Sequence, residues 1–252
     1  MCSSDLSVAQ VAGPTGYRYA VQITGAAGNT GAALVQRIES YNCSDLSGQT
    51  VTIQANISVS SAQTVSWFLY YPGAQDNWSS QTTIASGSWS ATTTATTFTA
   101  TISGLPSGST NGLQLLIAPQ GGGAFTSGTI TITGVQLELG SVATPFEVRS
   151  LSSELALCQR YYETGVGTIG GYTSGGIGNY FHLGWKVTKR TAPTVTYAVG
   201  STANVGTYNI ENADTWGADW YCVGSAAGGF YWQGTWTASA DRKSTRLNSS
   251  HT

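Results

Sequence analysis

Apolar and polar residues alternate along several stretches of this chain. In residues 51–59 (VTIQANISV), every odd position from Val51 to Val59 is apolar and every even position is polar. Residues 17–24 (YRYAVQIT) follow nearly the same pattern. A period of two predicts a β-strand with one buried face and one solvated face. Both stretches are therefore expected to be strands that cover a hydrophobic core.

Turn signals separate further predicted strands. Pro72–Gly73 ends the apolar stretch 64–71, and in 129–139 the alternation changes phase at Gly134, which predicts a β-bulge. The other strands expected in this half of the chain are 96–102 and 113–118. Many short strands with regular turns are typical of a jelly-roll β-sandwich, which we expect over 7–147.

The second half of the chain predicts a short helix and a smaller β domain. We expect a linker and helix in 148–163, with Ser153 capping SELALCQRYY at 153–162. Residues 164–180 contain seven glycines, which predicts a linker there. The predicted strands of this C-terminal β domain, 164–240, are 180–189, 194–199, 205–210, 219–223 and 229–237. The predicted fold class is therefore all-β: a jelly roll, a short connecting helix, then a smaller β domain.

Composition narrows the possible functions. Only 9% of the 252 residues are charged and the net charge is −2, so neither a nucleic-acid patch nor a helical bundle is expected. No apolar stretch is long enough to predict membrane insertion. The 30 serines and 35 threonines instead predict polar surfaces suited to sugars or to close packing between chains.

Both ends of the sequence look artificial. Residues 241–251 (DRKSTRLNSSH) translate a string that matches a standard short-read sequencing adapter, and residues 1–6 (MCSSDL) translate its reverse complement. We therefore expect 1–6 and 241–252 to be sequencing-adapter artefacts without a packed role, and 7–240 to be a fragment of a longer gene product.

Cysteines and tryptophans carry further expectations. Cys43, Cys158 and Cys222 are odd in number and spaced unlike a disulfide framework, which predicts free, partly buried thiols in a reducing cytoplasm. The predicted C-terminal domain contains five tryptophans, at 185, 216, 220, 232 and 236. That is many for about 75 residues, so some of them are expected to face a partner chain.

The sequence gives only weak evidence for catalytic or metal-binding residues. The acidic residues Glu211, Asp214 and Asp219 are the densest carboxylate group, but they lie in a predicted turn region where such residues commonly stabilise turns. A glycosidase carboxylate pair or a calcium site there remains an alternative. His182 lacks a nearby second ligand, and GVGTIG at 165–170 is not preceded by a strand and followed by a helix. We expect no enzyme activity, no cofactor and no metal.

An aromatic group around a polar segment is the stronger candidate site. Trp67 and Trp89 are expected in the sandwich core, whereas Trp78 lies among polar neighbours. Sugars stack their apolar faces on aromatic rings while amides and carboxylates bind the hydroxyls. If residues 72–81 form a loop at the rim, the residues expected to bind a ligand are Trp78, Tyr70, Tyr71, Asp76, Asn77 and Gln81.

The segment ITGVQLELGSVATPFEVRSLSSELALCQRYYE, residues 132–163, resembles a recurrent signature of bacteriophage tail fibre and related tail proteins. In that family GVQLE and ATPFE close a jelly roll similar to carbohydrate-binding modules, and LCQRYY opens a C-terminal domain. Residues 32–60 resemble the first half of that jelly roll. The resemblance implies a non-enzymatic component of the virion tail, made in the host bacterial cytoplasm and assembled as a homotrimer with other tail proteins.

The resemblance leaves alternatives open. The host-facing tail implies a host cell-surface glycan as partner, but it names no sugar. A carbohydrate-binding module of a secreted bacterial glycoside hydrolase is one alternative, and a structural spacer without a ligand is another. Genes neighbouring the parent gene would distinguish these alternatives.

Overall fold

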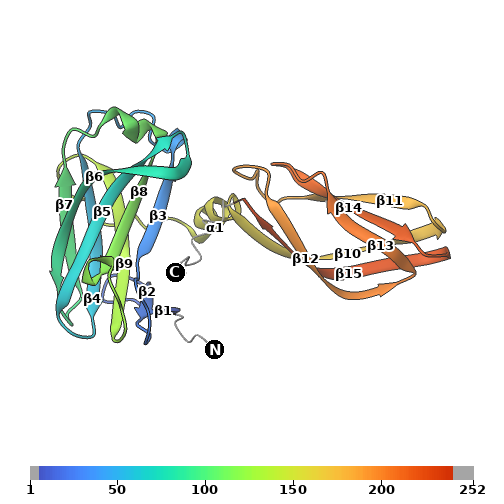
Figure 1. The fold of residues 1–252 in the computed structure, drawn as a ribbon, viewed down its shortest axis with the longest axis horizontal. Helices are drawn as coiled ribbons and strands as arrows, with labels where there is room; N and C mark the ends of the chain where they lie inside the picture. The colour runs from blue at the N-terminus through green and yellow to red at the C-terminus, as the bar shows by residue number, and fades with distance from the viewer. Residues whose placement is uncertain (1–5, 241–252) are drawn as a thin grey trace, which may run out of the picture. The chain divides into compact units, whose positions relative to one another are not determined.

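The computed structural model describes residues 6–240, which form two compact units that divide between Glu147 and Val148. Each unit is a two-layer antiparallel β-sandwich (Figure 1). The predicted fold class is therefore confirmed: a jelly-roll sandwich, a short helix and a smaller β unit. None of the helices within 6–240 is long and apolar enough to cross a membrane.

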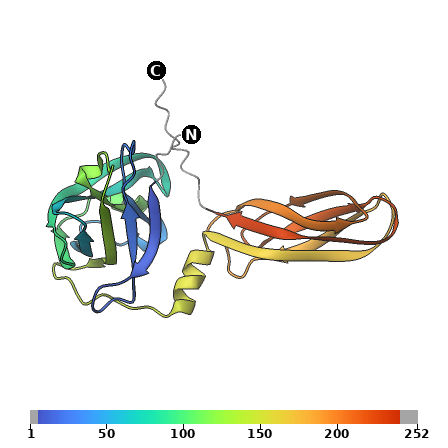
Figure 2. The same ribbon diagram turned by 90° about the horizontal axis from the view of Figure 1, so that it is seen from below.

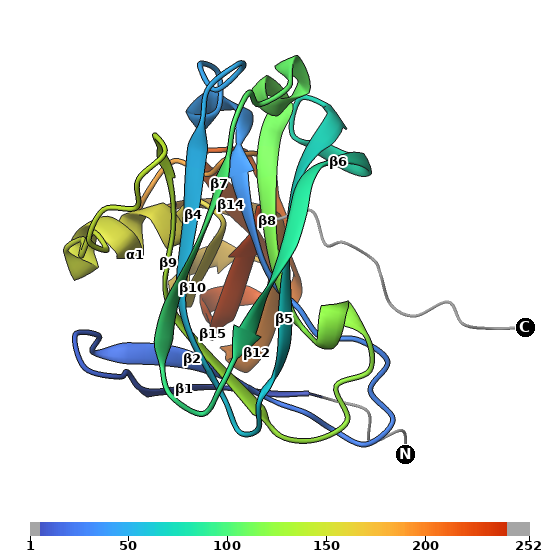
Figure 3. The same cartoon turned by 90° about the vertical axis from the view of Figure 1, so that its left-hand side faces the viewer.

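One layer of the first unit is a five-stranded sheet in the order β1–β2–β9–β4–β7 (Figure 3). Its strands are β1 (Ser7–Ala12), β2 (Tyr19–Thr24), β9 (Thr129–Leu139), β4 (Val51–Val59) and β7 (Thr96–Ile102). The four strands predicted here match closely, and the predicted bulge is confirmed. The register of β9 against β4 shifts at Gly134, whose φ of 57° favours glycine. A side chain there would also collide with Tyr17, because an added Cβ would lie 2.6 Å from its hydroxyl oxygen.

The other layer of the first unit is a four-stranded sheet in the order β3–β8–β5–β6. Its strands are β3 (Leu34–Glu39), β8 (Gly112–Pro119), β5 (Gln63–Ala74) and β6 (Asn77–Ala91). Three short 3-10 helices lie at the connections: η1 (Ser40–Asn42), η2 (Ser107–Asn111) and η3 (Gln120–Gly122).

Inward-facing aliphatic side chains of both sheets form the core of the first unit. The odd positions of β4 face this core as predicted, together with Leu113, Leu115 and Ile117 of β8. The expectation for Trp67 and Trp89 is confirmed: both are buried, with ring centroids 6.1 Å apart.

The segment that carries the tail-protein resemblance is tied to the sheet by hydrogen bonds. Both oxygens of Glu138 accept from Thr144, at 2.8 Å from its backbone N–H and 2.6 Å from its hydroxyl. The amide oxygen of Gln136 accepts from the backbone N–H of Glu147 at 2.9 Å, and Gln54 donates to the carbonyl of Thr144 at 3.0 Å. These side chains hold the segment that follows β9 against the five-stranded sheet.

The second unit begins with the helix α1 (Leu151–Gln159), slightly earlier than the predicted 153–162. Its N-cap is Ser150 and not Ser153: the Ser150 hydroxyl accepts from the backbone N–H of Ser153 at 3.2 Å. The helix stops before Tyr162, because Tyr162 is already paired with Ser239 in a sheet.

Two three-stranded sheets form the second unit, and their strands run along its length in two layers (Figure 2). One sheet contains β10 (Tyr162–Ser174), β15 (Ala227–Ser239) and β12 (Thr194–Ala203), in that order. The other contains β11 (Gly178–Gly184), β14 (Gly217–Gly224) and β13 (Val205–Glu211). The prediction of a glycine-rich linker at 164–180 is wrong, since β10 pairs with β15 along its whole length.

Glycines on the inner side of β10 make room for tryptophan rings. A Cβ on Gly165 would lie 2.6 Å from Cε2 of Trp236, and one on Gly167 would lie 3.3 Å from Cζ3 of Trp232. The buried tryptophans of the unit are Trp185, Trp220, Trp232 and Trp236. Trp216 is 68% exposed. The unit therefore buries four of its five tryptophans by itself, and the expectation that some face a partner chain stays a prediction for Trp216 alone.

A buried ion pair closes the start of the second unit. Lys189 Nζ lies 2.6 Å from Oε2 of Glu163 and donates to the carbonyl of Gln159, also at 2.6 Å. The side chains of Lys189 and Glu163 are both almost fully buried. At the other end of the unit's chain, the backbone N–H of Ala240 donates to the carbonyl of Tyr161 at 2.7 Å.

The three cysteines within the described residues are free thiols. Cys43 of the first unit and Cys222 of the second are buried, whereas Cys158 on α1 is exposed. Burial raises the pKa of Cys43 to about 11 and raises that of Cys222. Both buried thiols therefore stay protonated at neutral pH.

Of the residues expected to be artefacts, 1–5 and 241–252 lie outside the described residues. Leu6 is described, and it packs against the core of the first unit. The expectation that Leu6 lacks a packed role is therefore wrong, because its aliphatic side chain lies next to apolar surface that any leucine can cover.

Candidate functional site

The segment 72–81 is part of a hairpin, not a loop. β5 continues through Pro72 to Ala74, and Pro72 pairs with Gln81 of β6. Pro72 is tolerated because the pairing between β5 and β8 ends earlier, at Tyr70 and Gln114. The expectation that Pro72–Gly73 ends the strand is therefore wrong, and the turn lies at residues 75 and 76.

Asp76 anchors the tip of this hairpin and is engaged within the protein. Its Oδ1 accepts from the backbone N–H of Ser40 at 3.0 Å, and its Oδ2 accepts from the Ser40 hydroxyl at 2.9 Å. The Asp76 N–H donates to the carbonyl of Asn111 at 2.9 Å. Beside it, Asn77 accepts from the backbone N–H of Ser79 at 3.2 Å. Both residues hold the turn, and their expected contact with a sugar stays a prediction.

Tyr70 and Tyr71 lie on opposite faces of β5, because successive strand residues point to opposite sides of a sheet. Tyr71 packs against η2, where a Cβ on Gly108 would lie 2.8 Å from Cζ of the Tyr71 ring. Tyr70 points outward, in register with Gln114. The two rings therefore do not flank one site, which differs from the sequence-based prediction that grouped them.

A polar row crosses the outward face of the four-stranded sheet. Arg37 of β3 pairs with Gln114 of β8, and Arg37 Nε donates to the Gln114 side-chain oxygen at 2.9 Å. Gln114 Nε2 in turn donates to the side-chain oxygen of Gln81 at 3.2 Å. Gln114 is only 4% exposed, so both ends of its amide are fixed by its neighbours. This row orients Arg37 and Gln81 on the surface.

Aromatic rings flank this row. The Phe68 and Tyr70 rings stack with centroids 5.9 Å apart and an interplanar angle of 13°. The Arg37 guanidinium carbon lies 5.1 Å from the centroid of the Trp78 ring. Burial raises the pKa of Tyr70, so its hydroxyl stays protonated at neutral pH and can both donate and accept. The Arg37 face is defined here as Arg37, Phe68, Tyr70, Trp78, Gln81 and Gln114.

Three residues of the Arg37 face were expected from the sequence and three were missed. Tyr70, Trp78 and Gln81 belong to the predicted group; Arg37, Phe68 and Gln114 do not. Gln114 carries a usable signal, since it is a single polar residue inside the apolar run GLQLLIA. Arg37 gives little signal in the sequence, because Gln114, its neighbour in space, lies 77 positions along the chain.

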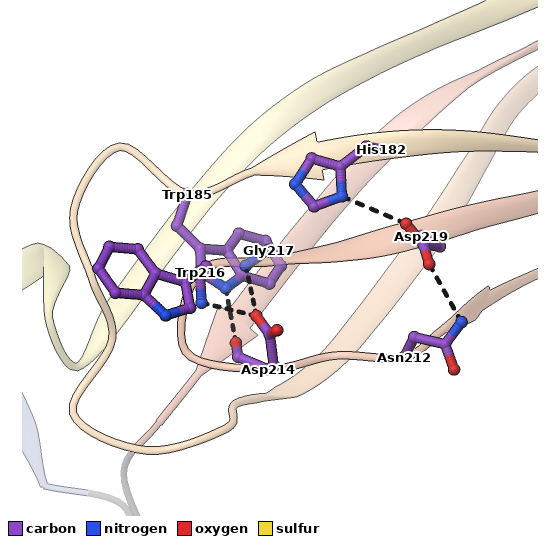
Figure 4. Close-up of polar contacts among 7 residues, drawn as sticks. All are labelled: His182, Trp185, Asn212, Asp214, Trp216, Gly217 and Asp219. Carbon is purple, nitrogen blue, oxygen red and sulfur yellow. Dashed lines mark hydrogen bonds and ion pairs between the residues drawn. The ribbon is translucent and has the colours of Figure 1, made fainter.

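The acidic group of the second unit divides into two arrangements, shown in Figure 4. Asp214 holds a turn: its Oδ1 accepts from the backbone N–H groups of Trp216 at 2.7 Å and Gly217 at 2.9 Å. Those two bonds lower the Asp214 pKa. Asp219 instead lies on a strand, with Oδ1 3.2 Å from Nδ1 of His182 and Oδ2 accepting from Asn212 at 3.0 Å.

No group of three or more His, Cys, Asp or Glu side chains within residues 6–240 is arranged to hold a metal ion. The glycine pattern at 165–170 lies inside β10 and faces tryptophan rings. The next element is the strand β11 and not a helix, so the pattern lacks the strand-to-helix turn that a dinucleotide site requires.

Neither a protein-family model nor a curated protein matches this sequence. Among solved structures, a CBM4 carbohydrate-binding module is similar over 55% of this chain and 81% of its own, with 19% identity and a TM-score of 0.41. The enzymatically active domain of tailspike protein 4 from bacteriophage CBA120 is similar over 54% of this chain but 18% of its own, with 12% identity and a TM-score of 0.41. The N-terminal cellulose-binding domain of Cellulomonas fimi β-1,4-glucanase C is similar over 49% and 80%, with 18% identity and a TM-score of 0.35.

Proposed function

We propose that the first unit binds carbohydrate on the Arg37 face, and that the chain is a non-enzymatic phage tail fibre component that contacts a host cell-surface glycan. The observation that carries the proposal is the hydrogen-bonded row from Arg37 through Gln114 to Gln81, flanked by aromatic rings. Such a row presents fixed hydrogen-bonding groups beside apolar rings, which is the combination that a sugar requires.

The row prepares its outer groups for a ligand. Gln114 is committed to its two neighbours, so it orients Arg37 and Gln81 without meeting the ligand itself. The bond to Gln114 uses Nε of Arg37, which leaves the two terminal amino groups of the guanidinium for sugar hydroxyls. Because these groups are held before binding, less conformational entropy is lost on complex formation.

The tail role has separate support. The segment 132–163 resembles phage tail proteins, as described above. A homotrimer is compatible with the sheet β10–β15–β12, whose three strands contain one charged residue, Glu163, and that residue is buried. An outer face without charges can pack against copies of the same chain without desolvating an ion.

Glycan binding is tested with the full chain against a panel of soluble polysaccharides and purified bacterial lipopolysaccharides, by affinity electrophoresis and calorimetry. Trp78→Ala removes a ring worth about 2 kcal/mol at a binding hot spot, so affinity should fall roughly thirtyfold. Tyr19→Ala is the control, because Tyr19 is an exposed ring on the other sheet. Unchanged glycan binding by Trp78→Ala would show that the site lies elsewhere. If the unsubstituted chain binds no glycan of the panel, the alternative of a ligand-free spacer is favoured.

Self-association is tested by light scattering at micromolar concentration. We expect a trimer that Thr235→Lys dissociates, because Thr235 pairs with Val166 and Ala198 at the centre of the charge-free face. Thr207→Lys places the same charge on the other sheet and should leave the trimer intact. If the chain without substitutions is a monomer at this concentration, the proposed homotrimer is contradicted.

A further inference from the structure

The second unit carries its own aromatic and polar surface on the outward face of the sheet β11–β14–β13. The Tyr221 face is defined here as Tyr180, His182, Glu211, Asn212, Asp219 and Tyr221. We propose that this face is a second carbohydrate site, and that it binds a sugar bearing a free amino group. The proposal does not depend on whether the Arg37 face binds a glycan.

Two glycines allow the rings of this face to lie flat on the sheet. A Cβ on Gly178 of β11 would lie 2.7 Å from the hydroxyl oxygen of Tyr221 and 2.9 Å from its Cζ. A Cβ on Gly217 of β14 would lie 2.6 Å from Nε2 of His182. Side chains usually stand upright on a strand. Here each ring covers a glycine of the neighbouring strand, which leaves a broad, shallow aromatic surface.

Tyr180 extends this surface. Its ring centroid lies 4.9 Å from that of Tyr221 with an interplanar angle of 41°, and Tyr180 is 60% exposed. Desolvation raises the Tyr180 pKa, and the nearby carboxylates Glu211 and Asp219 raise it further. The Tyr180 hydroxyl therefore stays protonated at neutral pH and is hydrogen-bonded to Glu211, while the exposed ring is open to a ligand.

A polar row runs beside the rings, from His182 on β11 through Asp219 on β14 to Asn212 after β13 (Figure 4). The hydrogen bonds from Asn212 and His182 lower the Asp219 pKa, so its carboxylate stays ionised. Glu211 lies directly opposite Asp219 in the register of β13 and β14. Two carboxylates therefore occupy neighbouring strands at one edge of the aromatic surface.

The charges of this face select the ligand. Strands β11, β13 and β14 contain no lysine and no arginine, so His182 is the one side chain on them that can carry positive charge. A protonated amine is attracted to carboxylates and to the faces of tyrosine rings. An acidic sugar would be repelled. An amino sugar fits because its apolar face can stack on Tyr221 while its ammonium group meets Asp219 and Glu211.

The test compares two ligands that differ only at the amine: a β-1,4-linked glucosamine hexamer and its fully N-acetylated counterpart, each titrated into the full chain by calorimetry. The amine form should bind on the order of tenfold more tightly, because acetylation removes its charge. Tyr180→Ala should weaken its binding about tenfold, since aromatic contacts dominate such sites. Asp219→Asn should weaken it about threefold, because an exposed ion pair contributes little.

Two controls separate this site from the rest of the molecule. Tyr231→Ala removes an exposed tyrosine from the outer face of the other sheet and should leave glucosamine binding unchanged. Arg37→Ala should also leave it unchanged, whereas it should weaken binding at the Arg37 face. Loss of binding in Arg37→Ala would assign the amino sugar to the first unit and overturn the proposal.

Gly178→Val tests the flat geometry without removing a ring. The added side chain should lift Tyr221 off the sheet and weaken glucosamine binding severalfold, while the fluorescence of the buried Trp220 and Trp232 reports that the unit stays folded. Equal binding of the two hexamers, or binding unchanged in both Tyr180→Ala and Gly178→Val, would overturn the proposal.

Discussion

The two units fill their interiors in different ways. The first packs alternating isoleucine, valine and leucine from two sheets, with Ile53, Ile57 and Leu113 fully buried. The second packs tryptophans against glycines, with Trp232 fully buried and Trp220 2% exposed. A small sandwich can thus reach a full core with few residues if large rings on one strand lie over empty positions on the next.

This difference predicts a large, local effect for the tryptophan core. Trp232→Ala should destabilise the second unit by about 4 kcal/mol, since truncating a buried aromatic leaves a cavity that rigid sheets fill poorly. Trp216→Ala is the matched control, and its cost should stay within about 0.5 kcal/mol because the ring is exposed. Calorimetry should show one of two transitions shifting to lower temperature. A shift of both transitions together would mean that the units do not unfold independently.

The buried ion pair between Lys189 and Glu163 is another feature of the second unit. Lys189→Met should destabilise this unit by about 3 kcal/mol, because it leaves Glu163 buried without its closest cation. Adding Glu163→Gln to that variant should recover part of the loss, which chemical denaturation of the two variants can measure. No recovery in the double variant would indicate that packing of the lysine stem is the main contribution.

The glycine positions should resist enlargement. Gly165→Val should cost about 2 kcal/mol, since its side chain would collide with the Trp236 ring. Thr164→Val adds a branched apolar residue one position away on the outward face and should cost less than about 0.5 kcal/mol. Similar melting temperatures for the two variants would contradict the role given to glycine.

The smallest expected effect lies at the segment that closes the first unit. Hydrogen bonds from Thr144 lower the pKa of Glu138. A lowered folded-state pKa means that the stabilisation is complete above the ordinary glutamate pKa, about 4.3, and is lost as the pH falls through the lowered value. Amide hydrogen exchange at Thr144 should therefore accelerate relative to the core of β4 only as the pH falls below about 4.3. Glu138→Gln should remove that pH dependence.

The sequence predicts the first unit better than the second for a physical reason. Alternation identifies β4, β7 and β9 because aliphatic side chains mark the buried face directly. It misses β10, because several inner residues of β10, such as Gly165 and Gly167, are glycines that lie against tryptophan rings of β15. Glycine occurs both in turns and in strands where an aromatic ring lies over it. The sequence pattern alone does not distinguish these two situations.

The candidate site was predictable in part for a similar reason. Trp78, Tyr70 and Gln81 are close in sequence, so local reasoning places them together. Their grouping with Tyr71 failed because the strand continues through Pro72, and alternation then sends neighbouring tyrosines to opposite faces. Arg37 and Gln114 enter the site through strand pairing, which depends on contacts between distant segments.

Each unit contains one buried thiol whose rate of chemical labelling can report how often that unit opens. Cys43 lies in the first unit and Cys222 in the second, and neither is exposed. A thiol reagent can reach them only when the surrounding strands separate, so the labelling rate of each cysteine measures how often its unit opens. Mass spectrometry of the labelled peptides would then report two opening rates from one sample, without any change to the chain.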